Sequence, residues 1–386
     1  MLDVIIIGAG PAGAAAAVTA CRKGLTVALI DKARFPRDKL CGGGITGRSR
    51  AYIHEIFGAT LPPGMALESR RVRIMAGTVV LGDLADAPPL HLTMRVDFDG
   101  WLHGLAIAAG AQDFTGQRIA RIDPALPAVT LEDGRHLTAR VLIGADGVNS
   151  ITAKALHGRA YDPDRIGFAM EAEVPHDAPP ADPVVEIDMA AVAWGYGWSF
   201  PKRGSVTLGV GGVHGRNPKM QARLADYLAL HGQAADDLRC KGAFLPFGDA
   251  RQPPGRGPVL LAGDAAGLVD PLTGEGIAWA MKSGQLAGRA AAAAIAAGHP
   301  GQAFARYDAA LAPVAAEMRH ARRLRALVYH PLLRGRFLRS LARQPGVQRR
   351  FLALLAGERD YADMRWSSFA RQILRVITGG RALPRG

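Results

Sequence analysis

Cysteine is scarce in this chain, and the few cysteines present are too far apart in the sequence to suggest a shared metal site or a disulfide. Three occur among 386 residues, at Cys21, Cys41 and Cys240. Because their number is odd and none lie close together, they exclude a zinc site or a disulfide framework as the basis of the fold. The sequence therefore predicts a protein of a reducing, cytoplasmic compartment.

Long apolar runs are also missing. The Ala-rich stretch from 277 to 297 is interrupted by Lys282 and Arg289, so it lacks the roughly 18 unbroken apolar residues that spanning a bilayer requires. The first expected strand begins at Leu2, which leaves no room for the charged and apolar regions of a signal peptide. We predict neither export nor a transmembrane helix.

Acidic residues are rare in the C-terminal part of the chain. Residues 319–386 hold sixteen Arg and no Lys against Glu358, Asp360 and Asp363, which accounts for the whole formal net charge of +13. This asymmetry predicts contact with an anionic surface, and a peripheral position on the inner membrane is one interpretation. A solvated arginine face is the alternative. Since no nucleic-acid-binding module is recognisable, no nucleic-acid partner is expected.

Apolar residues recur at helical spacing in the same region and predict an amphipathic membrane anchor. The apolar stripe would comprise Leu324, Leu327, Val328, Phe337, Leu338 and Leu341, flanked by Arg322, Arg325, Arg334, Arg336 and Arg339. The alternative is that this stripe packs on the body of the protein.

The N-terminus reads as a βαβ unit. An apolar run from Asp3 to Ile7 leads into Gly8-Ala9-Gly10-Pro11-Ala12-Gly13, an Ala-rich helix, and a second apolar strand that ends at Asp31. In such a unit Gly8 makes the tight turn, Gly10 lets a pyrophosphate approach, and Gly13 allows close packing of helix on strand. Asp31 stands where an acid accepts hydrogen bonds from an adenosine ribose and disfavours a 2′-phosphate.

Two later strands also end at an acid. Residues 140–147 and 258–264 place Asp146 and Asp264 directly after apolar runs. Either acid alone would be interpreted as a helix cap. Together, and after the glycine-rich turn, they predict two more segments at the carboxyl ends of the same sheet, beside one cofactor.

The chain between these segments changes character. Residues 160–250 contain strand-like pieces punctuated by Pro and Gly, and helical spacing resumes from Ala303. We therefore predict an α/β fold with a Rossmann-type domain, an inserted antiparallel-sheet substrate domain and a C-terminal helical region. The expected boundaries are 1–70, 95–158 and 253–300 for the first, 71–94 and 159–252 for the second, and 301–386 for the third.

These segments together resemble the three FAD signatures of the para-hydroxybenzoate hydroxylase superfamily. Three further stretches resemble the geranylgeranyl reductase family: residues 39–44 (Lys-Leu-Cys-Gly-Gly-Gly), 196–202 (Tyr-Gly-Trp-Ser-Phe-Pro-Lys), and Gly274-Glu275-Gly276-Ile277. Gly267 follows Gly263-Asp264-Ala265-Ala266, where related aromatic hydroxylases often carry His, and this difference favours the reductase branch. Trp194 and Trp198 do not form the Trp-x-Trp-x-Ile-Pro stretch of flavin halogenases, which argues against a halogenase.

The resemblance implies FAD as cofactor and names its contacts. These would be Ala12, Asp31, Cys41, Gly42, Gly44, Arg95, Asp264, Gly276 and Ile277. Asp264 would hold the ribityl chain. The backbone at Gly276 and Ile277, which open a long helix, could stabilise negative charge on the reduced flavin.

The resemblance also implies reduction of double bonds in a prenyl chain, with hydride from reduced flavin N5. Tyr196, Trp198 and Phe200 alternate along a strand and would present three rings to an isoprenoid chain, although core packing is the alternative. Cys41 could help to deliver the proton, or be an inert buried thiol. NADPH, ferredoxin or another protein would donate electrons. The competing functions are an FAD monooxygenase of a hydrophobic aromatic compound and a non-catalytic flavoprotein held to nucleic acid by its tail.

Overall fold

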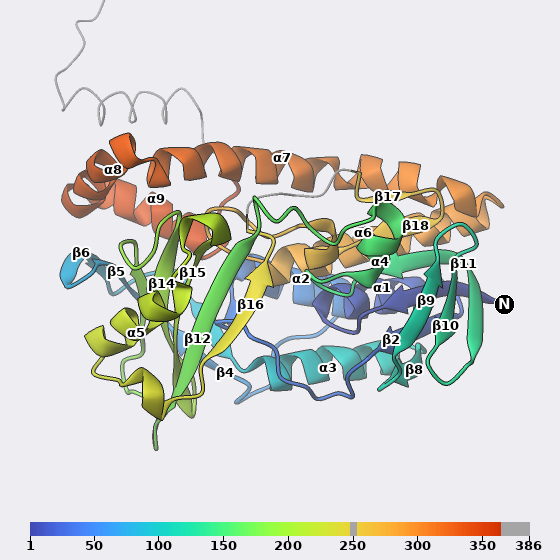
Figure 1. Cartoon of the computed structure of the whole chain (residues 1–386), viewed down its shortest axis with the longest axis horizontal. Coiled ribbons are helices and arrows are strands. Elements are labelled where there is room, and N and C mark those ends of the chain that lie inside the picture. Colours follow the sequence, from blue (N-terminus) through green and yellow to red (C-terminus); the bar gives the residue numbers. More distant parts are fainter. Residues whose placement is uncertain (248–252, 364–386) are drawn as a thin grey trace, which may run out of the picture.

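A computed structural model describes residues 1–247 and 253–363 of the chain. Two large sheets lie at opposite ends of an elongated molecule, and a long C-terminal helix runs along one edge over both (Figure 1). The glycine-rich turn and the two later strands that end at an acid belong to the first sheet, whereas residues 39–44 lead into a small third sheet.

The first sheet is largely parallel, with two short strands added at one side. Its main path runs β17 (Gly255–Arg256), β18 (Val259–Leu261), β11 (His136–Gly144), β1 (Leu2–Ile7), β2 (Val27–Asp31) and β8 (Gln112–Thr115), while β10 (Ala128–Leu131) and β9 (Ile119–Asp123) extend from β11. Strand β1 is central, with Val4 opposite Val141 of β11 and Val27 of β2. Such a strand is buried on both faces, which explains its unbroken apolar run.

Helices pack closely on this sheet. They are α1 (Pro11–Cys21), α2 (Gly47–Phe57), α3 (Arg95–Ala108), α4 (Ile151–His157) and α6 (Ile277–Ala296), with the 3₁₀ turn η3 at Gly263–Ala266 before α6. Helix α1 contacts both α3 and α6. A Cβ atom added at Gly284 of α6 would lie 2.0 Å from the carbonyl oxygen of Ala12. The two helix backbones therefore touch, which only small residues allow.

The second sheet is antiparallel apart from one pair of strands. Its order is β16 (Lys241–Leu245), β12 (Gly167–Pro175), β15 (Ser205–Val213), β14 (Gly195–Pro201), β13 (Val184–Asp188), β5 (Arg71–Ala76) and β6 (Val79–Leu84), with β13 and β5 parallel. Helix α5 (Met220–Leu230) packs on β12 and β15. A small third sheet, β3 (Gly44–Ile45), β7 (Leu90–Thr93) and β4 (Ala66–Ser69), borders the site. Short 3₁₀ turns occur at His214–Arg216, Ala235–Asp237 and Pro300–Gln302.

This arrangement confirms the predicted fold class: a Rossmann-type parallel sheet, an inserted and mainly antiparallel sheet, and a helical C-terminal region. The exact domain boundaries stay a prediction. Within the described residues, no helix has the length and apolar character needed to cross a membrane.

The C-terminal helices correct one expectation. They are α7 (Ala303–Tyr329), α8 (Pro331–Arg343) and α9 (Pro345–Leu355). The predicted membrane-facing stripe instead packs inward: Leu324, Val328 and Leu341 are buried in the second hydrophobic core, and its other members pack against that core. The helical spacing of the apolar residues was predicted correctly, but these residues are buried against the second sheet and not in lipid. The basic region continues through 364–386, outside the described residues.

Candidate functional site

A cavity of about 720 Å³ opens between the two large sheets. Its volume is in the range of cavities that hold cofactors and their substrates. One end is lined by Gly8, Gly10, Asp31 and Asp264, and another part by Tyr196, Trp198 and Phe200. The structure thus brings the glycine-rich turn and the aromatic strand, nearly 190 residues apart in sequence, to one cavity.

The glycine-rich turn has no room for a side chain at Gly8 or at Gly13. Gly8 has φ +99°, and an added Cβ would lie 2.2 Å from the carbonyl oxygen of Ala145. A Cβ at Gly13 would lie 1.8 Å from the Gly8 carbonyl oxygen. At Gly10 the nearest group is the Arg37 guanidinium, 3.4 Å from the added Cβ. The turn therefore leaves its backbone open towards the cavity, with a cation beside it.

Asp31 lies at the end of β2, as predicted. One carboxylate oxygen accepts the N–H of Ala9 and the other that of Ala33, each at 2.9 Å. These bonds fix the carboxylate at the cavity wall. A carboxylate oxygen can accept more than one hydrogen bond, so both retain capacity for ribose hydroxyls.

Two helix N-termini line the cavity, and neither has a side-chain cap. Helix α1 begins after Gly10 and helix α6 after Gly276, and neither carries an acid in its first turn. Uncapped N–H groups and the helix dipole favour anions. Together with Arg37 and Lys39, which also line the cavity, these termini fit a diphosphate-bearing cofactor that becomes more negative on reduction.

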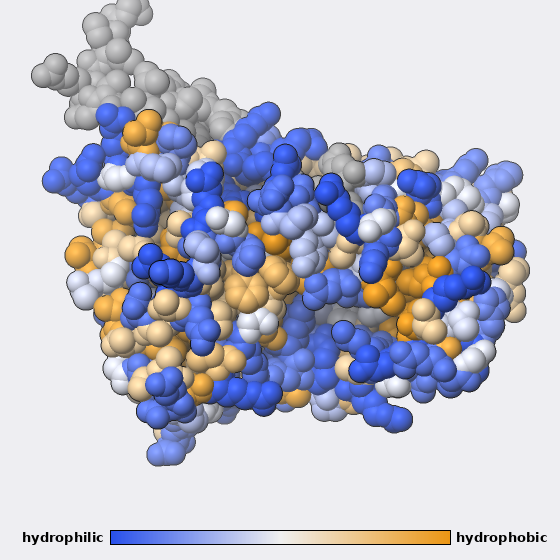
Figure 2. Space-filling view, in the orientation of Figure 1, coloured by the Kyte–Doolittle hydropathy of each residue, from blue (hydrophilic) through white to orange (hydrophobic). Residues whose placement is uncertain are grey.

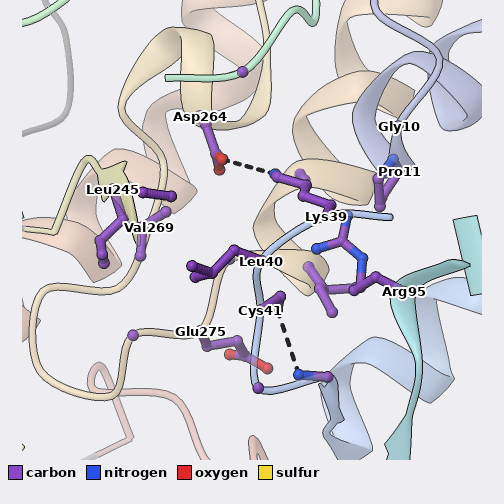
Figure 3. A pocket seen from close by; sticks show the side chains of 18 of the residues that line it. Gly10, Pro11, Lys39, Leu40, Cys41, Arg95, Leu245, Asp264, Val269 and Glu275 are labelled. Carbon is purple, nitrogen blue, oxygen red and sulfur yellow. Dashed lines mark hydrogen bonds and ion pairs between the residues drawn. The ribbon is translucent and has the colours of Figure 1, made fainter. Parts of the chain in front are cut away.

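Asp264 and Lys39 meet across the cavity (Figure 3). The Lys39 ammonium lies 3.2 Å from the Asp264 carboxylate, and both side chains are partly exposed. An added Cβ at Gly276 would lie 3.8 Å from Asp264, so the acid also borders the start of α6. This places Asp264 where a polar side chain could hold the linker between a diphosphate and a ring.

The loop at residues 41–44 lies on the aromatic face of β14. A Cβ at Gly42 would lie 2.8 Å from the Phe200 ring and 3.3 Å from the Trp198 indole nitrogen. The ring centroids of Trp198 and Phe200 are 6.5 Å apart, and those of Tyr196 and Trp198 are 6.1 Å apart. The predicted alternation is thus observed, and all three rings line the cavity. Glycine is needed at 42 because a side chain would collide with them.

Cys41 and Arg95 are neighbours at the cavity wall. The Cys41 sulfur accepts the Gly43 N–H at 3.4 Å. Arg95 is buried and bonds Asp99 through two nitrogens at 2.7 and 2.8 Å. Burial alone would raise the pKa of Asp99, but Arg95 overrides it and holds that pKa below its usual range. The Arg95–Asp99 pair therefore places a fixed guanidinium beside the thiol.

Asp146 has a role that the sequence argument set aside. It borders the cavity, but its carboxylate accepts the Ser150 hydroxyl at 2.6 Å and the Thr152 N–H at 3.0 Å. These bonds satisfy the N-terminus of α4. The Asp146 side chain thus caps helix α4. Any contact with the cofactor would be made by its remaining lone pairs or by the backbone.

Comparison with known proteins agrees with this geometry. The family described as FAD dependent oxidoreductase matches residues 3–79. A menaquinone reductase of Mycobacterium tuberculosis is 32% identical over 306 residues, covering 74% of this chain and 75% of the relative. A geranylgeranyl diphosphate reductase of Rhodobacter capsulatus is 31% identical over 318 residues, covering 77% of each. This chain belongs to the geranylgeranyl reductase family of FAD-dependent oxidoreductases.

Solved structures show the same fold. A geranylgeranyl bacteriochlorophyll reductase-like protein of Thermoplasma acidophilum superposes with a TM-score of 0.75 at 19% identity, covering 97% of this chain and 99% of the other. A flavin-dependent brominase gives a TM-score of 0.74 at 20% identity, covering 98% and 100%. At such identities the likeness concerns the fold alone. Family membership makes the protein an FAD-dependent oxidoreductase with FAD as its cofactor.

Glu171 was missed by sequence reasoning. It lies on β12, is 4% exposed, and accepts the Cys41 N–H at 2.9 Å, while its other oxygen is buried without a hydrogen-bond partner. Burial raises the pKa of Glu171 to about 7, against the lowering effects of Lys202 and the Cys41 N–H. The only sign of it in the local sequence is its position two residues after Ala169 on the same strand. Residues two apart share one face of a strand, and Ala169 lines the cavity. A buried acid that can titrate near neutrality thus lies beside Cys41 of the cavity wall.

We expect Asp31→Ala to weaken FAD binding roughly 10- to 100-fold, because a hydrogen bond to a charged group contributes about 1.5 to 3 kcal/mol. Fluorescence titration of the apoprotein with FAD would measure the dissociation constant. Asp113→Ala is the control, since Asp113 lies on the adjacent strand β8 and does not line the cavity. Unchanged FAD affinity in Asp31→Ala would contradict the assignment of the ribose site.

The raised pKa of Glu171 predicts a pH-dependent stability. Burial favours the protonated acid in the folded state, so its contribution to stability is complete below the ordinary glutamate pKa of 4.5 and is lost as the pH rises through about 7. We expect a loss of about 3 kcal/mol at most between pH 4.5 and 8. Glu171→Gln keeps an acceptor for Cys41 and should lack this loss, so it should be the more stable protein at pH 8.

Urea unfolding of the FAD-loaded protein at several pH values would measure this difference. Glu132→Gln, at an exposed position, is the control and should follow the wild type. A Glu171→Gln variant with the same pH profile as the wild type would show that Glu171 is not the titrating group.

Proposed function

We propose that this protein saturates double bonds of a prenyl, geranylgeranyl-type chain carried on a lipid, a pigment or a quinone. The observation that carries the proposal is that one cavity joins the dinucleotide-binding turn to a wall of three aromatic rings. Relatives named for geranylgeranyl diphosphate and menaquinone reduction support the same class of substrate.

The apolar part of the cavity suits a chain without polar groups. Beyond Trp198 it is lined by Val72, Leu90, Leu92, Val185, Ile187, Leu352 and Leu355. Such a surface binds an isoprenoid by removing apolar area from water. It also keeps water away from the reacting carbon atoms. Tyr196 donates its hydroxyl hydrogen bond to the Thr273 carbonyl oxygen, so even this polar ring presents an apolar face to the chain.

Saturation of an isolated alkene needs one hydride and one proton. Reduced flavin, when bound, supplies the hydride from N5, and the protein must supply the proton. We assign proton delivery to Cys41, because its thiol lines the cavity. Glu171 holds the Cys41 backbone through a hydrogen bond, so it fixes where the thiol points. NADPH or a reduced protein such as ferredoxin would restore the reduced flavin.

Anaerobically reduced protein should convert a geranylgeranyl compound to products heavier by pairs of hydrogen atoms. Trp198→Ala should lower turnover at least tenfold, because loss of a buried aromatic ring opens the channel that orients the chain. Mass spectrometry of the product and flavin absorbance follow the reaction. Tyr161→Phe, at a ring outside the cavity, is the control. Substrate-stimulated oxygen uptake with a hydroxylated product would instead establish the monooxygenase alternative.

We further propose that the protein approaches its lipid-soluble substrate at an anionic membrane. Exposed arginines cover α7 and α8, including Arg323, Arg336, Arg339 and Arg343, and Leu332 beside them is 78% exposed. Hydrophilic side chains dominate this edge of the molecule (Figure 2). Each Arg near an acidic leaflet contributes about 1 kcal/mol, and salt screens the attraction.

Replacing Arg336, Arg339 and Arg343 with Gln should reduce binding to anionic vesicles several-fold at low salt. These side chains are exposed, so the fold should be unaffected. The matched control replaces three exposed arginines of the other end of the molecule: Arg118, Arg121 and Arg256. Sedimentation with anionic and neutral vesicles at two salt concentrations makes the comparison. Equal binding to both vesicle types, or equal loss in the control, would contradict the proposal.

A further inference from the structure

The loop that precedes helix α6 is held in shape by its own acid. Residues 270–276 lead into α6, and Thr273, Gly274, Glu275 and Gly276 line the cavity. The Asp270 carboxylate accepts the N–H groups of Leu272 and Thr273 at 2.8 and 2.9 Å. The Gly274 N–H also bonds the Asp270 carbonyl oxygen at 2.9 Å. Asp270 therefore organises the turn that presents this backbone to the cavity.

Both acids of this loop also bond outside it. The Tyr361 hydroxyl donates to Asp270 at 3.0 Å, across 91 positions of sequence. Glu275 accepts hydrogen bonds from Thr46 and Arg48. Arg48 in turn bonds Asp360 at 2.8 Å and the carbonyl oxygen of residue 359 at 3.0 Å. The loop is thus tied twice to residues 359–361, which follow helix α9.

The segment at 359–361 is itself anchored to helix α7. Glu317 accepts the N–H groups of Tyr361 and Ala362 at 2.7 and 3.0 Å. Tyr361 is 3% exposed, and the Arg48 and Glu275 side chains are 7% and 5% exposed. Partners at such depth cannot be replaced by water, so removing one leaves the other unsatisfied. The Asp360 side chain, by contrast, is 54% exposed.

We infer that Asp360 and Tyr361 are positioning residues that hold the 270–276 loop in the conformation that binds FAD. Neither lines the cavity between the two large sheets, and they act through Arg48 and Asp270. The uncapped N–H groups at the start of α6 then face the cofactor and stabilise negative charge on its reduced form. A loosened loop weakens FAD binding and makes reduction less favourable. The inference rests on the proposed placement of the flavin and is independent of the substrate.

The test compares Tyr361→Phe and Asp360→Asn with the control Asp363→Asn. Asp363 is exposed on the same segment, and its backbone N–H bonds the Asp360 carbonyl oxygen rather than the loop. We expect the FAD dissociation constant to rise roughly two- to tenfold in the first two variants, because Tyr361→Phe removes a hydrogen bond to Asp270 and Asp360→Asn removes the negative charge that strengthens the bond from Arg48. The midpoint potential of the bound flavin should become more negative in both. The control should match the wild type in both measurements.

Unchanged FAD affinity and midpoint potential in Tyr361→Phe and Asp360→Asn would overturn the inference, even if their melting temperatures fall. If Tyr361→Phe does not fold, Asp360→Asn decides on the same two measurements, since its side chain is half exposed. Asp31→Ala is titrated in parallel because it acts at the ribose end. If that variant also binds FAD normally, the flavin placement is wrong, whereas a weakened Asp31→Ala beside a normal Asp360→Asn rejects only the positioning role.

Discussion

Close backbone packing around helix α1 sets the position of everything else in the site. Its carbonyl at Ala12 would lie 2.0 Å from a Cβ at Gly284, and the turn before it admits no Cβ at Gly8 or Gly13. Protein interiors resist even one extra methyl group where packing is this tight. The helix N-terminus, the end of β2 and the start of α6 are therefore fixed relative to one another. A rigid scaffold of this kind can hold a long cofactor at several separated points.

The second sheet adds what the parallel sheet cannot provide. Strand β14 carries its three rings on one face, and the loop at 41–44 lies against them through Gly42. The C-terminal helices close the apolar part of the cavity through Leu352 and Leu355. The same helices bury the apolar stripe that could otherwise have faced lipid. Their outer face carries exposed arginines, so the cavity wall and the surface charge come from opposite sides of one region.

Local patterns in the sequence were sufficient for the fold and for part of the site. The turn at Gly8 to Gly13, the acid at Asp31 and the alternation of β14 are each encoded within a few residues, and each was found where predicted. Arg37, Glu171 and Tyr361 were missed because their roles come from contacts across the fold. The role of Asp146 could not be decided from the sequence, because a helix-capping acid and a cofactor-binding acid can both occur directly after a strand.

We propose that one cavity holds FAD at the glycine-rich turn and a prenyl chain on the aromatic wall. A crystal structure of the FAD-loaded protein with a bound geranylgeranyl alcohol tests it most directly. We expect the adenosine ribose at Asp31, the flavin ring at the start of α6, and the isoprenoid chain against Trp198 and Phe200 with a double bond facing N5. A cofactor in another place, or a chain bound away from these rings, would contradict it.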